Sequence, residues 1–167
     1  MPATYFQRLR AWKASYPVVE KTYLYEVYTD GRRFFINWLG TTVPAFTKRA
    51  AREWAEDIMA WSKVPRAWKR QLKHVYHAYG NESSTTQHIG YSRGGGFAAF
   101  FGGTGYGALT VKGLKVKKGA KLVPVKASDP VHFALGILDP YGRYPGFRNV
   151  SKDPALAMFG PRHSHFE

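Results

Sequence analysis

The chain contains no cysteine among its 167 residues. A disulfide framework, a thiolate metal site and a thiol nucleophile are therefore excluded, and serine or threonine is the expected nucleophile of any covalent catalysis. The sequence also lacks an apolar run long enough to span a bilayer, and its first residues lack the apolar core of a signal peptide. We therefore expect an intracellular, cytoplasmic protein without a transmembrane segment, either free or associated with the surface of a membrane or a particle.

Acidic residues are scarce, since 11 Asp+Glu stand against 25 Lys+Arg and the formal net charge is +14. A field of this sign attracts polyanions, so the candidate partners are nucleic acid, an anionic membrane surface or an acidic protein. One cluster of basic residues surrounds Trp68 and would give a helix face that meets phosphates; it consists of Arg66, Lys69, Arg70 and Lys73. The apolar side of the same helix is more simply explained by core packing.

The length predicts one domain over residues 1–167. Hydrophobic residues make up 44% and aromatic residues 16% of the chain, which is enough for a packed core and argues against disorder. Residues 1–20 are interpreted as an N-terminal arm. Its aromatic side chains either touch a membrane or, more simply, pack over the domain; they are Tyr5, Phe6, Trp12 and Tyr16.

The middle of the chain alternates strand-like and helix-like patterns. Residues 23–28 and 32–39 flank Asp30-Gly31, a dipeptide favoured in tight turns, and predict a hairpin that feeds a buried strand. From residue 44 to 61 apolar residues recur at three- and four-residue steps, which predicts an amphipathic helix. Its outer face is expected to carry Lys48, Arg49, Arg52 and Glu56.

A second helix is predicted to begin at Pro65 and to end at Gly80. A short strand then leads into Ser92 and a run of small residues that begins a helix, and residues 109–125 are interpreted as two further short strands. Strands that alternate with helices predict a compact α/β fold with a mainly parallel sheet and flanking helices.

The motif that carries chemistry is Gly90-Tyr91-Ser92-Arg93-Gly94. A serine on a sharp turn between a strand and a helix needs small residues two positions before and after it, because side chains there would clash. Such a turn directs the hydroxyl out of the sheet and offers the amide of the next residue, Arg93, to an oxyanion. A glycine-rich turn without catalytic meaning is the alternative, because the chain has 17 glycines.

Two residues further along extend the motif to a triad. In hydrolases of this fold the acid and then the histidine follow the serine along the chain. Asp129 ends an apolar, strand-like segment, and His163 lies in the C-terminal region.

Three blocks of the sequence carry a family resemblance. They are Phe34-Phe35-Ile36-Asn37-Trp38-Leu39-Gly40-Thr41, His88-Ile89-Gly90-Tyr91-Ser92-Arg93-Gly94-Gly95 and Leu122-Val123-Pro124-Val125-Lys126-Ala127-Ser128-Asp129-Pro130-Val131. In this order they resemble the class 3 lipase family, the phospholipase A1-like branch of the α/β-hydrolases. The resemblance implies a minimal α/β-hydrolase type of fold and a short and divergent member of the family. The segment between the motif and Asp129 is short for the family, and the family usually has histidine at the position of Tyr91.

The resemblance implies Ser92 as nucleophile, Asp129 as acid and His163 as general base, with Thr41 and Arg93 in the oxyanion hole. Gly90 and Gly94 would shape the elbow. Alternatives stay open for two of these roles: His165 for the base, and Asp139 or Asp153 for the acid. The substrate would be a lipid or a small carboxylic ester, and no cofactor and no metal are expected.

The sequence leaves two other functions open. A non-catalytic basic protein on a hydrolase-like scaffold would bind nucleic acid, an anionic membrane or a particle through its charge. A phosphate-binding role for the glycine-rich run is weaker, because no Gly-Lys-Ser/Thr follows it. His74 and His77 lie three residues apart on the predicted second helix, but they have no acid or third ligand that would indicate a metal site.

Overall fold

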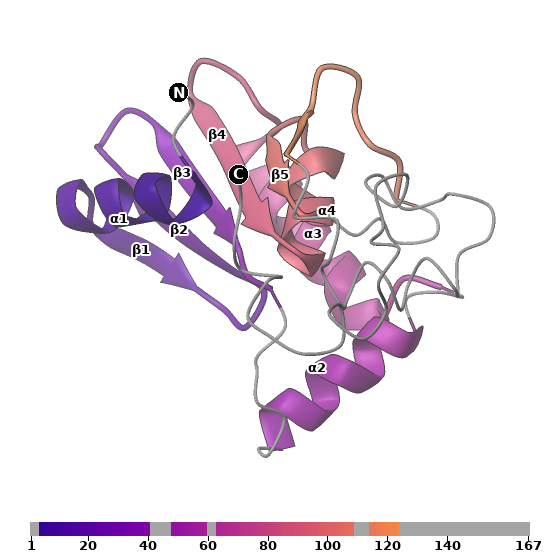
Figure 1. Cartoon of the computed structure of the whole chain (residues 1–167). Helices are drawn as coiled ribbons and strands as arrows, with labels where there is room; N and C mark the ends of the chain where they lie inside the picture. Colours follow the sequence, from indigo (N-terminus) through magenta and orange to yellow (C-terminus); the bar gives the residue numbers. More distant parts are fainter. Residues whose placement is uncertain (1–3, 41–47, 60–62, 109–113, 124–167) are drawn as a thin grey trace, which may run out of the picture.

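The computed structural model describes residues 4–40, 48–59, 63–108 and 114–123. The described chain contains four helices and six strands, and it forms an α/β fold (Figure 1). The helices are α1 Tyr5–Ser15, α2 Lys48–Met59, α3 Arg66–Tyr79 and α4 Arg93–Phe100. The strands are β1 Val18–Lys21, β2 Tyr25–Thr29, β3 Phe34–Trp38, β4 Thr86–Tyr91, β5 Thr104–Tyr106 and β6 Lys121–Val123.

The six strands form one mixed sheet in the order β1-β2-β3-β4-β5-β6. The first two pairings, β1 with β2 and β2 with β3, are antiparallel, and the pairings from β3 to β6 are parallel. The parallel part holds the segment around Ser92 near its centre. The expected α/β fold with flanking helices is therefore confirmed, and the sheet is mixed because the N-terminal strands run as a meander.

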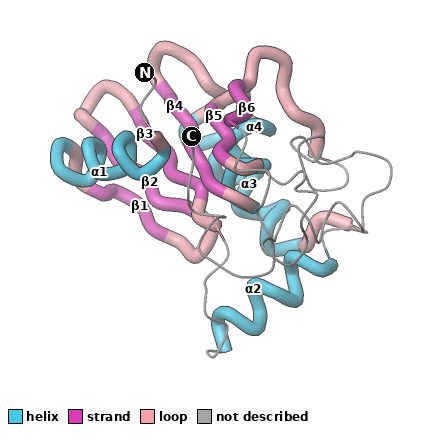
Figure 2. Tube along the Cα trace, viewed as in Figure 1, coloured by secondary structure: helices cyan, strands magenta, loops and turns pink. Residues whose placement is uncertain are grey.

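Helices cover both faces of the sheet, as Figure 2 shows. Helix α1 packs on one face, where Tyr5 and Trp12 contact Tyr28, Phe35 and other apolar side chains. The opposite face packs against α3 and α4, and its core includes Trp38, Trp68, Leu72, Val75 and Phe97. Neighbouring residues of β3, such as Phe35 and Ile36, enter opposite clusters because side chains alternate along a strand.

The hairpin predicted around Asp30-Gly31 is confirmed. Strands β2 and β3 pair from Tyr25 with Trp38 to Thr29 with Phe34. Gly31 has a φ of 88°, a conformation that a residue with a side chain rarely adopts. Asp30 stabilises the turn, since its carboxylate accepts hydrogen bonds from the amides of Arg32 and Arg33 at 2.9 and 2.7 Å.

The two predicted helices are also confirmed, with one correction. Helix α3 follows Pro65 and ends at Gly80, as the sequence indicates. Glu56 of α2, however, does not lie on the outer face, because it is only 9% exposed and accepts hydrogen bonds from α3 and from Tyr23. Charge alone suggested an exposed position, and the donors Tyr23 and Trp68 belong to other elements of the fold.

Two features near the ends of the described chain were not predicted. Residues 5–15 of the N-terminal arm form a helix, which begins with a capping box between Thr4 and Gln7. Strand β5 was missed because glycines surround Thr104 and Tyr106 and leave no apolar run to indicate a strand. Of the two short strands predicted over residues 109–125, β6 is present; residues 109–113 lie outside the described chain.

Candidate functional site

Ser92 lies on a sharp turn between a strand and a helix. Strand β4 ends at Tyr91 and helix α4 begins at Arg93, so Ser92 is the single residue between them. Its backbone has φ 56° and ψ −123°, and within the described chain it is the only residue other than glycine with positive φ. Such a conformation is strained and tends to occur at functional sites.

The glycines on either side are required by close backbone contacts. A Cβ atom added at Gly90 would lie 2.1 Å from the carbonyl oxygen of Gly94. One added at Gly94 would lie 2.1 Å from the carbonyl oxygen of Trp38 in the neighbouring strand. Both distances are far below van der Waals contact, and the obstructing atoms belong to the backbone, which cannot move aside. The turn thus explains the spacing of the two glycines around Ser92.

The hydroxyl of Ser92 does not cap the helix that follows. A serine at this position normally accepts a hydrogen bond from an amide in the first helical turn. Here Ser92 occupies the N-cap position of α4, yet its side chain makes no capping hydrogen bond. The ordinary structural reason for a serine before a helix is therefore absent. The residue as a whole is buried, with 6% of its surface exposed.

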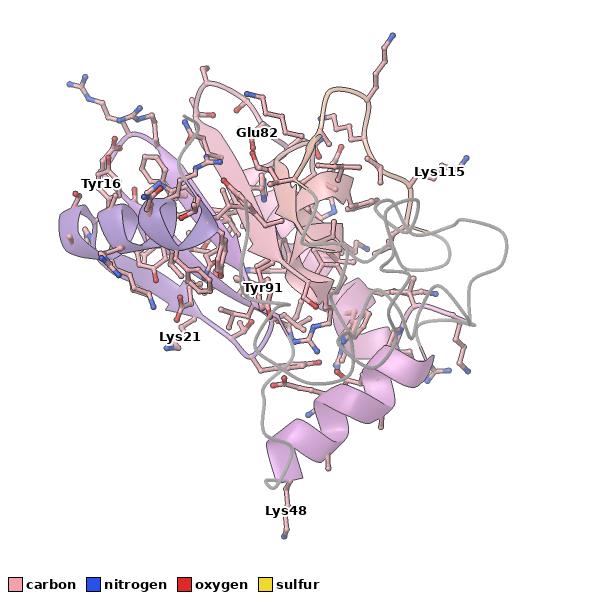
Figure 3. The ribbon with its side chains drawn as sticks, viewed as in Figure 1. Tyr16, Lys21, Lys48, Glu82, Tyr91 and Lys115 are labelled. Atoms are coloured by element: carbon pink, nitrogen blue, oxygen red, sulfur yellow. The ribbon has the colours of Figure 1, made fainter. Side chains whose placement is uncertain are left out.

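Strands β3 to β6 run parallel, so their carboxyl ends meet at the edge of the sheet that holds Ser92. Tyr91, the last residue of β4, lies at the opposite end of the strand from Glu82 (Figure 3). The amide of Ser92 donates to the carbonyl of Tyr106 in β5 at 2.9 Å. Gly107 in turn donates to the carbonyl of Val123, the last residue of β6, at 2.8 Å. Strand β5 therefore ends beside Ser92, and β6 ends next to β5 on the same side of the sheet.

The end of β3 also lies against this turn. A Cβ added at Gly40 would lie 2.8 Å from Cδ1 of Tyr91 and 3.2 Å from its carbonyl oxygen. Gly40 is thus packed against the residue that precedes Ser92. Because parallel strands share one carboxyl edge, β3 and β6 both end on the side of the sheet that holds Ser92.

Four of the predicted site residues belong to the described chain, and they lie together: Gly90, Ser92, Arg93 and Gly94. The other three, Thr41, Asp129 and His163, lie outside the described residues. So do the alternatives Asp139, Asp153 and His165. The roles of all these residues stay predictions.

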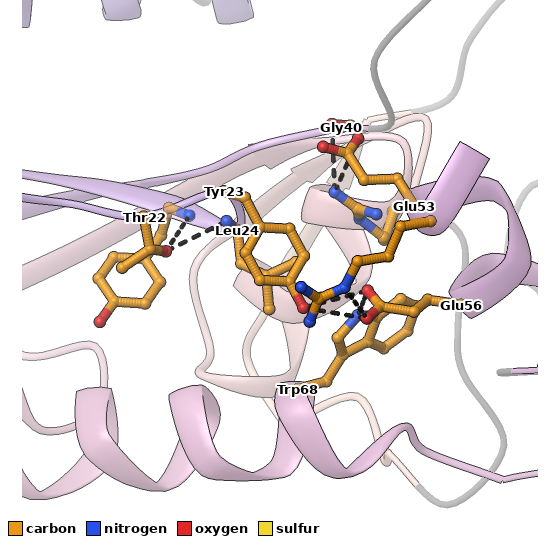
Figure 4. A network of polar contacts seen from close by, with 10 residues as sticks. Thr22, Tyr23, Leu24, Gly40, Glu53, Glu56 and Trp68 are labelled. Atoms are coloured by element: carbon orange, nitrogen blue, oxygen red, sulfur yellow. Dashed lines mark hydrogen bonds and ion pairs between the residues drawn. The ribbon is translucent and has the colours of Figure 1, made fainter. Parts of the chain in front are cut away.

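Arg93 has a buried side chain, which its sequence position did not indicate. It is 2% exposed and forms an ion pair at 3.7 Å with Glu53 of α2, itself 1% exposed. One guanidinium nitrogen, Nη2, donates to the carbonyl of Gly40 at 3.3 Å, and the group lies over the ring of Trp68 at 5.5 Å. Figure 4 shows Glu53 reaching toward Gly40. The one sequence signal for this buried ion pair was that the acidic residue Glu53 stands next to an apolar position of the predicted helix, Trp54.

A second buried carboxylate joins α2 to the body of the protein. Glu56 accepts hydrogen bonds from Trp68 Nε1 at 2.8 Å and from the hydroxyl of Tyr23 at 3.0 Å, as Figure 4 shows. Arg52 adds an ion pair at 3.0 Å. Trp68 is fully buried, so it does not belong to the exposed basic face of α3 that the sequence suggested. Of the residues that the sequence placed on that face, the basic ones are exposed: Arg66, Lys69, Arg70 and Lys73.

His88 of β4 is the buried histidine nearest to the turn in sequence. It stacks on Phe101, accepts a hydrogen bond from Trp38 Nε1 at 3.1 Å and lies 3.2 Å from the carbonyl of Gly80. Because the indole nitrogen only donates, Nδ1 accepts and the proton sits on Nε2. Burial lowers the pKa of His88 to about 3, so the ring is neutral at ordinary pH. We assign it a structural role in holding β4.

Among the residues that the structure describes, no three His, Asp or Glu side chains gather to hold a metal ion. None of the described helices is long and apolar enough to cross a membrane. Comparisons of the chain with protein-family models, with curated proteins and with solved structures find no match.

Proposed function

We propose that the protein is a serine hydrolase that cleaves carboxylic esters, with Ser92 as its nucleophile. One observation carries the proposal: Ser92 adopts a strained positive-φ turn between a parallel strand and a helix, and its hydroxyl makes no capping hydrogen bond. Two glycines that tolerate no side chain enforce this turn. A structural turn would have no need of such strain at a serine.

In the proposed reaction, Ser92 Oγ attacks the carbonyl carbon of the ester while His163 accepts its proton. Asp129 orients the histidine and stabilises its charged form. The tetrahedral intermediate collapses, the C–O bond to the alcohol breaks, and the histidine returns the proton to the leaving alcohol. Water then attacks the acyl-enzyme in the same series of steps, with the histidine again as the base, and this releases the acid and the free serine.

The oxyanion of the intermediate would be stabilised by Thr41 and by the amide of Arg93, at the start of α4. The partial positive charge at the N-terminus of a helix favours the same oxygen. The arrangement of the sheet supports these roles, because Gly40 precedes Thr41 and packs on Tyr91. Asp129 follows β6 by six residues, and six residues span at most about 20 Å.

The substrate class follows from the family resemblance and from the charge. A lipid or small ester fits the lipase-like blocks, and the net charge of +14 favours an anionic molecule such as an acidic phospholipid. Turnover of short-chain against long-chain esters would separate an esterase from a lipase.

Labelling with a fluorophosphonate probe tests the nucleophile directly. We expect wild-type protein to be labelled at Ser92, and Ser92→Ala to lose the label and the ester hydrolysis together. Ser84→Ala removes an exposed serine elsewhere and is the matched control. If folded wild-type protein takes no label, or if Ser92→Ala keeps it, the proposal is wrong.

A second candidate, binding of nucleic acid without catalysis, is favoured by the exposed face of α3. This helix has no acidic residue, and its basic residues are all exposed; they are Arg66, Lys69, Arg70 and Lys73. Its apolar side faces the core and is not available to enter a membrane. Salt-dependent binding to nucleic acid that Ser92→Ala leaves unchanged, in a protein that takes no fluorophosphonate, would favour this candidate.

A further inference from the structure

Helix α3 has an exposed face with a high density of positive charge. The apolar residues Trp68, Leu72 and Val75 belong to the core, so the opposite side of the helix is open to solvent. The basic residues on that side are all exposed; they are Arg66, Lys69, Arg70 and Lys73. The helix contains no acidic residue that would neutralise them. An anionic partner would therefore meet cations along much of the helix.

One exposed aromatic side chain stands in line with these cations. Of the large apolar side chains of α3, only Tyr76 is exposed, at 51%. It follows Lys69 by seven residues and Lys73 by three, so the three side chains share one side of the exposed face. The ring of His77 lies 5.4 Å from that of Tyr76 at an angle of 87° and restrains it. The tyrosine ring is thus accessible beside two ammonium groups.

The other side of the exposed face is already occupied. His74 stands there, and its Nε2 lies 3.1 Å from the carboxylate of Glu20 in β1. An anion that approached from this side would meet that carboxylate. The side of α3 that is open to an anion is therefore the one with Lys69, Lys73 and Tyr76.

We propose that this side of α3 binds a single strand of nucleic acid, with the lysines on phosphates and Tyr76 stacked on a base. Cations that follow the backbone of a strand, with an aromatic ring among them, are a recurring means of holding single strands. A duplex would offer the phosphates without the stacking, because neighbouring bases cover the faces of each base. The helix rises about 15 Å from Arg66 to Tyr76, which is the length of about four stacked nucleotides.

The inference rests on the second candidate function, nucleic acid binding. It adds the form of nucleic acid that is bound and the side chain that selects this form. The proposed surface does not include Ser92, so the nucleophile and the surface are tested separately.

Other anionic partners use only part of this surface. A membrane would need an apolar face beside the charges, but the apolar residues of α3 lie in the core and Tyr76 is a single ring. A second copy of the chain carries the same net charge of +14 and would be repelled. An acidic protein would pair with the lysines but would offer no base to the tyrosine. A single strand of nucleic acid engages both the charge and the ring.

Fluorescence anisotropy with labelled oligonucleotides of about 12 residues tests the role of the ring. The probes are oligo(dT), oligo(U) and a DNA duplex of the same length. We expect Tyr76→Ala to weaken binding of the single strands by about 5- to 30-fold, because stacking on one base is lost, and binding of the duplex by less than about twofold. Tyr76→Phe should keep the wild-type affinity, and Tyr76→Leu, which keeps bulk without a ring, should behave like Tyr76→Ala. Phe6→Ala, which removes an exposed ring from α1, is the matched control.

The double variant Lys69→Gln, Lys73→Gln tests the contacts with phosphates. Each phosphate contact contributes about 0.7 to the slope of log K against log salt concentration for a single strand, so the slope should become shallower by about 1.4. The double variant Arg10→Gln, Lys13→Gln removes the same charge from exposed positions of α1, on the other face of the sheet (Figure 2), and is the matched control. It should keep the wild-type slope.

The possible outcomes separate this inference from the functions proposed above. If Tyr76→Ala or Tyr76→Leu binds single strands like wild type, or weakens duplex binding equally, the inference is wrong and nucleic acid binding still stands. Tighter binding to poly-glutamate or to phosphatidylserine vesicles than to any of the oligonucleotides would also overturn it. Wild-type protein that binds no oligonucleotide in a salt-dependent way would overturn the inference and the second candidate together. Fluorophosphonate labelling would still decide the role of Ser92.

Discussion

Acidification should destabilise this protein through His88, the neutral histidine buried in the strand that leads to Ser92. Burial lowers its pKa in the folded protein to about 3, whereas an unfolded chain has a histidine pKa of about 6.5. Between these values the unfolded state binds a proton that the folded state refuses. Stability is therefore fully present above about pH 6.5 and falls as the pH drops toward 3.

The size of the effect follows from how far the pH is lowered below the pKa of histidine in the unfolded chain. One pKa unit corresponds to about 1.4 kcal/mol, so lowering the pH from 7 to 4.5 should cost about 3 kcal/mol through this residue alone. No discount for solvent applies, because the ring of His88 is 1% exposed and stacks on Phe101. This is a large fraction of the stability of a typical domain.

The assay is urea unfolding at pH 7 and pH 4.5 for wild type and for His88→Gln. Glutamine keeps an acceptor and a donor but does not titrate, so the variant should be weaker at pH 7 and should lose about 3 kcal/mol less on acidification. His77→Gln, at an exposed histidine of α3, is the matched control and should keep the wild-type pH dependence.

Carboxylates also make the stability fall on acidification. Their contribution cancels when the loss in His88→Gln is subtracted from the loss in wild type. For Glu26, burial raises the pKa, but hydrogen bonds from Lys21, Tyr28 and Asn37 outweigh it and hold the pKa below its usual value. A group of this kind contributes stability that is lost as the pH falls through its folded pKa. Wild type and His88→Gln share this loss. Equal losses of stability in the two proteins between pH 7 and 4.5 would refute the reasoning about His88.

Three further outcomes are expected. Gly94→Ala places a methyl group 2.1 Å from a backbone oxygen. It should therefore destabilise the protein by about 3 kcal/mol or more in urea unfolding and abolish fluorophosphonate labelling of the refolded sample. Unaltered urea unfolding would contradict the sharp turn at Ser92. Trp68→Phe removes a donor to the buried carboxylate of Glu56 and should cost about 1.5 to 3 kcal/mol in urea unfolding, and no change would mean that water replaces the indole. Trp12→Ala should cost about 3 to 5 kcal/mol while Phe6→Ala, at an exposed site of the same helix, costs less than about 0.5; equal effects would show that α1 does not pack as described.

Local patterns were sufficient wherever a short segment determines its own structure. The turn at Asp30-Gly31 follows from a dipeptide, and the bounds of α3 follow from Pro65, Gly80 and the apolar spacing between them. The elbow belongs to the same group. Two glycines placed symmetrically about Ser92 already predicted a turn between a strand and a helix, because side chains at those two places would clash in it.

What only the tertiary structure decided are the contacts between segments distant in the chain. The mixed direction of the sheet depends on how β1 to β3 meet the parallel strands, and no local pattern encodes that. The sequence did not indicate that Glu53 and Arg93 are buried, because a charge is buried only when another segment supplies its partner. The sequence by itself thus determined the sharp turn at Ser92, and the packing of α2 and β3 decided that the side chain of Arg93 holds the Gly40 carbonyl.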